Sequence, residues 1–142
     1  MHKFTLAAAL LLAFAVPAMA QDHGAHGAAP AADLPAICLA NAQQASAPMA
    51  MQHAAGADAA HVDLMDGMDA MNADMAAGGT AADIDVAFIC SMIPHHRGAI
   101  DMAKAELAHG DDPWAKEMAQ AVITAQEKEI ADMLAWLEKQ PQ

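Results

Sequence analysis

Residues 80–113 read TAADIDVAFICSMIPHHRGAIDMAKAELAHGDDP, and they contain the start, the body and the end of one helix. Thr80-x-x-Asp83 resembles a capping box with Asp in place of the usual Glu. From there to about Ala108, apolar residues recur at the spacing of one helix face. Pro94 lies inside this run and removes one backbone hydrogen bond, which predicts a kink.

The sequence on either side predicts three more helices. Gly110 ends the quoted helix, and Asp111 or Asp112 followed by Pro113 opens the last one. Gly78-Gly79 ends the helix before it. No segment alternates with a two-residue period, so we expect no sheet. The predicted fold is an all-α antiparallel bundle of three long helices and one short N-terminal helix, with the other helices at 37–47, 59–77 and 114–138.

The first 20 residues have the pattern of a secretory signal peptide. Lys3 precedes a mostly apolar run from Phe4 to Val16, and Ala18-Met19-Ala20 supplies a small-x-small cleavage site. The run is too short to span a bilayer, so we expect export to the periplasm or beyond rather than membrane insertion. We therefore divide the chain into a signal peptide (1–20), a flexible His-, Gly- and Ala-rich tail (21–33) and one bundle domain (34–142).

The net charge restricts which partners the protein can bind, and the two cysteines indicate what forms between them in an oxidising compartment. The chain has 6 basic and 18 acidic side chains, a net charge of −12, which argues against nucleic acid and anionic membranes and favours cations. In an exported protein, two cysteines predict a disulfide between Cys38 and Cys90.

Four residues in the middle of the quoted stretch form a candidate metal site. His95 and His96 are adjacent, and Met92 and Met102 lie one to two turns away on the same helical arc, beside Phe88. We expect this arc to face the bundle. Thioether and imidazole donors together favour copper, above all Cu(I), with Ag(I) or Cu(II) as alternatives.

The preceding helix carries a methionine stripe that we expect to form the opposing wall of the site. The alternative is that these side chains only fill the core, as flexible methionines often do. The stripe contains Met65, Met68, Met71 and Met75.

Two inward-facing carboxylates, Glu106 and Glu129, are candidates to accept a hydrogen bond from a metal-bound imidazole. The alternative for both is partial exposure or a pair with a basic side chain. Secondary metal ligands are also proposed, and one set would form at a new amino terminus after signal cleavage, unless Gln21 cyclises. These secondary candidates are Gln21, Asp22, His23, Met49, Met51, His53 and His61.

Residues 88–103 (FICSMIPHHRGAIDMA) and 125–137 (AQEKEIADMLAWL) closely resemble the signature of domain-of-unknown-function family 305. The resemblance covers roughly Ala59 to Leu137 and implies a ferritin-like helical bundle. The family includes a periplasmic copper-binding protein linked to copper and silver resistance. By this resemblance, four residues correspond to motif positions of the family: Met92, His95, His96 and Met102. Met68 and Met71 correspond to methionines in the family's Met-rich helix.

These observations lead us to expect a periplasmic copper-binding protein that serves homeostasis, resistance or trafficking. A copper exporter or a chaperone is the expected partner, and the sequence does not specify the oligomeric state. We expect no enzymatic activity, because the chain has no nucleophile–base pair and no phosphate-binding loop. The alternatives are a helical interaction or oligomerisation module without metal, and a ferritin-like oxidase, which would need two Glu-x-x-His motifs where this chain has one.

Overall fold

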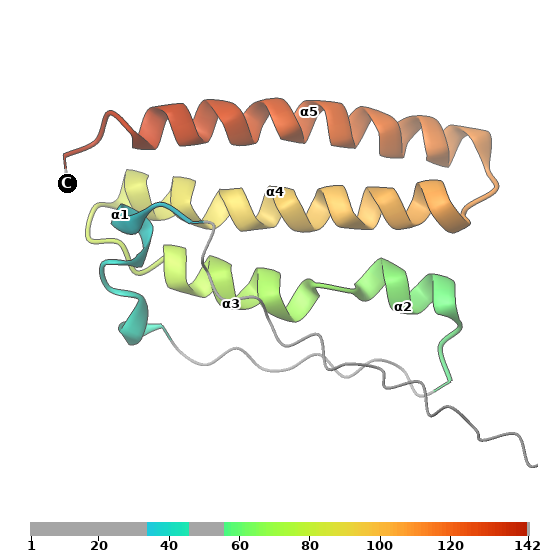
Figure 1. Ribbon diagram of the computed structural model, residues 1–142, viewed down its shortest axis with the longest axis horizontal. Coiled ribbons are helices and arrows are strands. Elements are labelled where there is room, and N and C mark those ends of the chain that lie inside the picture. Colours follow the sequence, from blue (N-terminus) through green and yellow to red (C-terminus); the bar gives the residue numbers. More distant parts are fainter. Residues whose placement is uncertain (1–33, 46–55, 142) are drawn as a thin grey trace, which may run out of the picture.

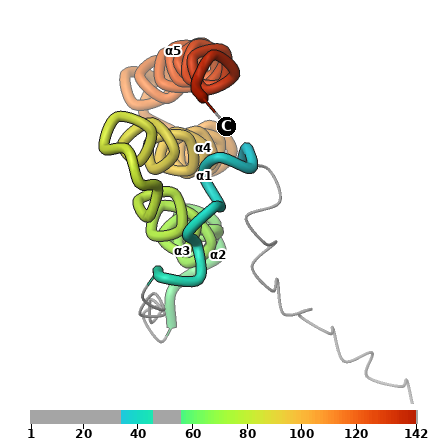
Figure 2. The backbone as a smooth tube through the Cα atoms, turned by 90° about the vertical axis from the view of Figure 1, so that its left-hand side faces the viewer, coloured from blue at the N-terminus to red at the C-terminus, as the bar shows by residue number. Residues whose placement is uncertain are grey.

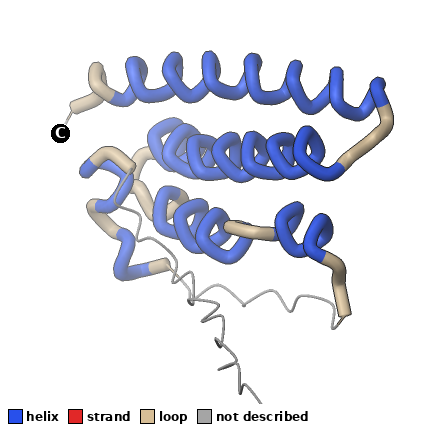
Figure 3. The backbone as a smooth tube through the Cα atoms, turned by 45° about the vertical axis from the view of Figure 1, so that its right-hand side comes forward, coloured by secondary structure: helices blue, strands red, loops and turns tan. Residues whose placement is uncertain are grey.

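The computed structural model describes residues 34–45 and 56–141 (Figure 1). This part of the chain is built from helices and loops, without strands, and it confirms the predicted all-α bundle (Figure 3). The elements in chain order are α1 (Ala36–Leu39), the short 3₁₀ helix η1 (Ala42–Gln44), α2 (Ala59–Met65), α3 (Met68–Gly78), α4 (Ile84–His109) and α5 (Pro113–Leu137).

The helices lie in one layer with α4 in the middle. The long helix α5 packs antiparallel along one edge of α4, and α3 and α2 follow one another along the other edge (Figure 1). Seen end-on, α1 and η1 lie on one side of this layer (Figure 2). The helix α4 therefore contributes to nearly every contact between the long elements.

Side-chain caps fix where the helices begin. Asp83 accepts hydrogen bonds from the backbone amides of Asp85 and Val86, and Asp112 accepts one from Ala115 before Pro113 in the first turn of α5. The predicted Thr80 capping box is wrong. The Thr80 hydroxyl instead donates to the Ala77 carbonyl at the end of α3, at 2.6 Å, so Asp83 alone caps α4.

The prediction of one helix at 59–77 is wrong, because the chain forms two helices, α2 and α3, in this stretch. Asp66 adopts an extended conformation, and Gly67 has φ of 76°, a value that glycine adopts without steric cost. The chain then begins α3, whose first-turn amide at Met71 donates to the Gly67 carbonyl. In contrast, α4 continues through the buried Pro94 as one helix of 26 residues.

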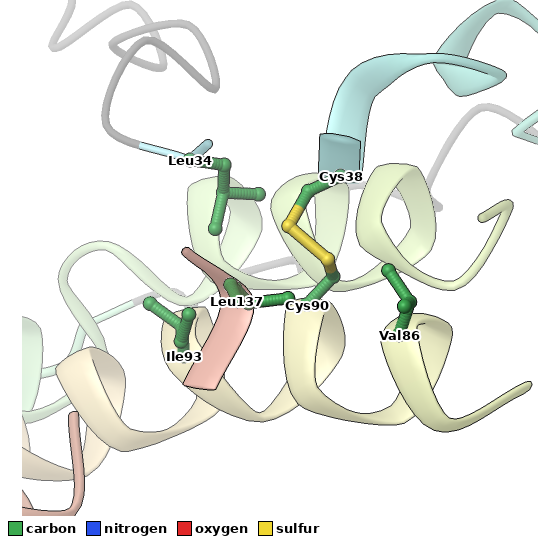
Figure 4. Packing of buried hydrophobic residues seen from close by; sticks show 6 residues of the cluster. All are labelled: Leu34, Cys38, Val86, Cys90, Ile93 and Leu137. Atoms are coloured by element: carbon green, nitrogen blue, oxygen red, sulfur yellow. A yellow bond between two sulfur atoms is a disulfide. The ribbon is translucent and has the colours of Figure 1, made fainter. Parts of the chain in front are cut away.

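The core lies where α1 crosses the layer (Figure 4). Cys38 and Cys90 form the predicted disulfide, with an S–S length of 2.00 Å, and both are fully buried. Gly78 packs so closely on the Cys90 backbone that a Cβ would lie 2.6 Å from its carbonyl oxygen. The cluster around the disulfide also contains Leu34, Val86, Ile93 and Leu137.

Burial along α5 is uneven. Ala119 and Leu137 are buried, but the large apolar side chains of Trp114 and Met118, near the start of the helix, are exposed. Within the ranges that the structure covers, no helix combines the length and the apolar character that a membrane crossing requires. The signal peptide and tail predicted at 1–33 lie outside those ranges.

Candidate metal site

The candidate arc on α4 faces the bundle only at one edge, at His96, and the rest of it is open, which corrects the expectation from the sequence. Phe88, His95 and Met102, spaced seven residues apart, are exposed on one stripe of the helix. The opposite side of α4 carries Cys90 and packs against α1. The physical reason is that α4 has neighbours on both edges and α1 over one side, so no element among the described residues covers the fourth side of the helix.

Met71 of α3 reaches this open stripe. Its thioether sulfur lies directly over Gly98 of α4, within the space that any side chain at position 98 would occupy. Gly98 is three residues after His95 and four before Met102, so the three positions are neighbours on the α4 surface. The structure therefore places one thioether of α3 over a position of α4 that neighbours the positions of His95 and Met102.

The other methionines of the predicted wall differ in position. Met75 is fixed beside α4, because its carbonyl accepts a hydrogen bond from the Ser91 hydroxyl at 3.1 Å. Met68 and Met75 lie on the side of α3 opposite the buried Ala77, about 180° and 200° around the helix from it. Met65 ends α2, on the far side of the break at Gly67. All of these methionines are half-buried, as is Met92 on α4.

His96 faces α5, away from the open stripe. Its Nε2 lies 2.7 Å from the Glu129 carboxylate, so Glu129 contacts an imidazole, although its own side chain is 58% exposed rather than inward-facing. The residue is only 8% exposed, and its Nδ1 is buried without a hydrogen-bond partner in the protein. The rings of His95 and His96 are 5.9 Å apart between centroids, at an interplanar angle of 61°.

The buried Nδ1 of His96 is the nitrogen of this ring that could bind a metal ion. An imidazole whose Nε2–H donates to a carboxylate keeps its Nδ1 lone pair free, and this is the usual state of a metal-binding histidine. Two imidazoles on one metal ion have centroids at most about 6.4 Å apart, since each metal–nitrogen bond is about 2 Å long. The observed 5.9 Å between His95 and His96 lies within this limit.

Glu106 does not reach the histidine pair. It lies ten residues after His96 on α4, which corresponds to about 15 Å along the helix axis. Its carboxylate packs against Gly110 at the end of α4 and lines a cavity of about 180 Å³ together with His61 and His109. A role for Glu106 beside His95 or His96 is therefore ruled out by distance.

His61 lies at the same end of the molecule and has a structural partner. Its Nδ1 is 2.8 Å from the Asp58 carboxylate, which also accepts from the His61 amide and so caps α2. Hydrogen bonds from the His61 side chain, and then from its backbone amide, lower the pKa of Asp58 below its ordinary value. Gln21, Asp22, His23, Met49, Met51 and His53 lie outside the described residues.

Two contacts at these helix interfaces were not anticipated. Gly98, which admits the Met71 sulfur, could have been found from its place next to Ala99, because two adjacent small residues allow a close approach of a neighbouring chain. The Nε2 of His109 lies 2.7 Å from the Asp63 carboxylate and so links α2 to the end of α4, but no sequence pattern predicts a contact between these two residues. Across residues 34–45 and 56–141, no three side chains of His, Cys, Asp or Glu gather so that they could hold a metal ion.

Comparison with protein families identifies the chain. The model of a domain of unknown function, DUF305, matches residues 15–137, most of the sequence. The protein therefore belongs to this family, as the motifs around the double histidine indicated. No curated protein matches the chain.

Proposed function

We propose that this protein binds Cu(I) in the periplasm through sulfur and nitrogen donors of α3 and α4. The observation that carries the proposal is the position of the Met71 sulfur over Gly98, a residue that lies between His95 and Met102 along α4. An exposed imidazole flanked by two thioethers from two helices is a donor set that soft metal ions prefer. Ag(I) has the same preference, and Cu(II) is the alternative oxidation state.

His96 and Met92 extend the same donor set toward α5. Met92 lies three residues before His95 and four before His96, so its side chain neighbours both on the helix surface. The buried Nδ1 of His96 offers a lone pair, while Glu129 fixes the ring from the other nitrogen. Removal of Glu129 would release the ring, so we assign it a positioning role.

The acidic surface and the apolar start of the chain support the biological setting. A net charge of −12 raises the local concentration of cations around the molecule. The signal-like pattern of residues 1–20 supports export, the setting in which we propose that copper is bound. We propose a role in copper homeostasis, resistance or trafficking, without a catalytic step, and with an exporter or a copper chaperone as the partner.

The test is a Cu(I) titration of the purified, metal-free protein in reducing buffer, with a competing chelator and with native mass spectrometry. We expect binding that weakens by at least about tenfold when Met92 and Met102 are both replaced by Leu, equivalent to about 1.4 kcal/mol or more. Met118→Leu is the matched control, because Met118 is an exposed methionine outside the donor set. Replacement of both methionines and both histidines without any change in affinity would refute the proposal.

One observation favours the alternative function, an interaction module. Phe88 on the open stripe is too exposed for a residue that only fills a core. Metal analysis of protein purified from cells grown with and without copper separates the two functions. A metal-free protein under both conditions would favour the interaction module.

A further inference from the structure

A cavity of about 390 Å³ lies at the end of the molecule where α1, the start of α4 and the end of α5 meet (Figure 1). Its volume falls within the range of roughly 300–1,000 Å³ that is usual for small-molecule sites in proteins. None of the proposed copper ligands lines this cavity. The residues that decide its chemistry are the apolar Ile37, Val86 and Trp136 and the polar Asn41, Asp83 and Asp85.

The walls of the cavity are held in place by contacts within the protein. The buried disulfide fixes α1 on α4. The Asn41 side chain donates a hydrogen bond to the Thr80 carbonyl at 3.1 Å and so ties η1 to the loop before α4. On the α5 side, the Gln140 side chain donates to the Trp136 carbonyl, also at 3.1 Å. Walls that are already ordered lose little conformational freedom when a ligand binds.

Two acidic residues and no basic residue line the cavity. Asp83 caps α4 through its Oδ1, which accepts hydrogen bonds from the amides of Asp85 and Val86. No ion pair of residues 34–45 and 56–141 includes the carboxylate of Asp85. Glu138 and Lys139, next to the cavity along the chain, carry opposite charges that cancel. The start of α4 contributes only about half a positive charge, so the cavity keeps a negative edge that attracts cations.

Trp136 gives the cavity an aromatic wall. Its side chain is half-buried, because it packs on the core cluster and also lines the cavity. An indole ring attracts a cation placed over its face. Ile37 and Val86 add aliphatic surface, which favours the uncharged part of a ligand. The cavity therefore combines carboxylates for a positive head with an apolar surface for a hydrocarbon body.

We propose that this cavity binds a small organic amine, with its ammonium group beside Asp83 and Asp85 and its apolar body against Trp136. A bare metal ion would make no use of the apolar walls, and an organic anion would be repelled by the two carboxylates. Amine binding does not depend on the proposed copper site, because the two sites share no residue.

The fluorescence of Trp136 in the metal-free protein provides the test. The chain has two tryptophans, so Trp114→Phe leaves Trp136 as the only one. Trp114 is 69% exposed and lies about 33 Å away along α5, so its replacement leaves the cavity unchanged. The probes are n-hexylammonium, n-hexanol and n-hexanoate, which share a hydrocarbon chain and differ in charge. We expect saturable binding of the amine at millimolar concentration, affinity at least about fivefold weaker for the alcohol, and no saturation with the carboxylate.

A double variant, Asp83→Asn with Asp85→Asn, removes the charge and keeps the helix. Asparagine is as good an N-cap as aspartate, and the side chain of Asp85 is exposed. We expect the affinity for n-hexylammonium to fall by about fivefold, because ion pairs of exposed carboxylates are individually weak, and the affinity for n-hexanol to stay the same. The matched control is Asp111→Asn with Glu117→Gln, which removes two exposed carboxylates at the other end of α4 and leaves the amine affinity unchanged. Circular dichroism checks that all variants keep the helical fold.

Three results would overturn the proposal. The absence of a saturable change in Trp136 emission would show that the amine does not enter the cavity. Equal affinities for n-hexylammonium and n-hexanol would exclude a cation-specific site. An amine affinity that is the same in the Asp83 and Asp85 double variant, or that falls equally in the control, would show that these two carboxylates have no specific role. A failure of copper binding would change none of these measurements, because they are made without metal.

Discussion

Removal of the disulfide should cost this protein a large share of its stability. Replacing both Cys38 and Cys90 with Ala opens a loop with a sequence separation of 52 residues. The entropy of the unfolded chain alone then predicts a loss of about 4 kcal/mol. A domain of this size has about 5–15 kcal/mol of stability in total, so the variant should be close to unfolding.

The structure also specifies which part should detach first. The helix α1 has 4 residues and η1 has 3, far below the length at which an isolated helix is stable. Their contacts with the layer centre on Leu34 and Cys38, the two residues of this segment that are buried. Without the crosslink, residues 34–45 should exchange their amide hydrogens almost as fast as an unfolded peptide.

Urea denaturation followed by circular dichroism measures the loss, and hydrogen exchange measures the detachment. Leu137→Ala is a useful comparison, because it removes a fully buried side chain from the same cluster without opening a loop and should cost about 2–5 kcal/mol. A loss below about 1 kcal/mol in the double Ala variant, at an unchanged dependence on urea, would refute the loop-entropy argument.

Three further outcomes are expected. Gly98→Ala should keep the fold and gain up to about 1 kcal/mol of helix propensity. Because the added Cβ displaces the flexible end of Met71, the affinity for Cu(I) should fall even though the melting temperature does not. An unchanged affinity would remove Met71 from the donor set. Glu129→Gln should destabilise the α4–α5 contact, because the hydrogen bond to His96 loses its charge. The expected loss is only about 1 kcal/mol, since Glu129 is 58% exposed and solvent screens its charge. A denaturation curve identical to that of the unmodified protein would contradict this. Asp58 has a lowered pKa in the folded protein, so its cap stabilises α2 above its ordinary pKa of 3.8 and is lost as the pH falls through the lower folded value. The amide signals of α2 measure this loss. If the first turn of α2 does not fray as the pH falls below the folded pKa of Asp58, the result would count against the cap.

The helices and the residues at which they begin and end follow from the sequence, because both depend on residues that are neighbours in the chain. Asp112 and Pro113 begin α5 as predicted, and Gly110 ends α4, since capping and proline geometry act within one turn. The partnership of Cys38 with Cys90 followed from elimination, as the chain has no other cysteine. The break at Gly67 was missed because apolar spacing continues through a glycine whose φ becomes positive only in the folded chain.

The orientation of the candidate site was decided by tertiary structure alone. Periodicity placed Phe88, His95 and Met102 on one stripe, but it could not say whether that stripe faces a neighbouring helix or water. The answer depends on which sides of α4 are taken by α5, by α3 and by the α1 segment that the disulfide holds in place. For the same reason the two adjacent histidines were treated as one unit, whereas the fold turns His96 to Glu129 and leaves His95 exposed, because successive residues on a helix point about 100° apart and meet different neighbours.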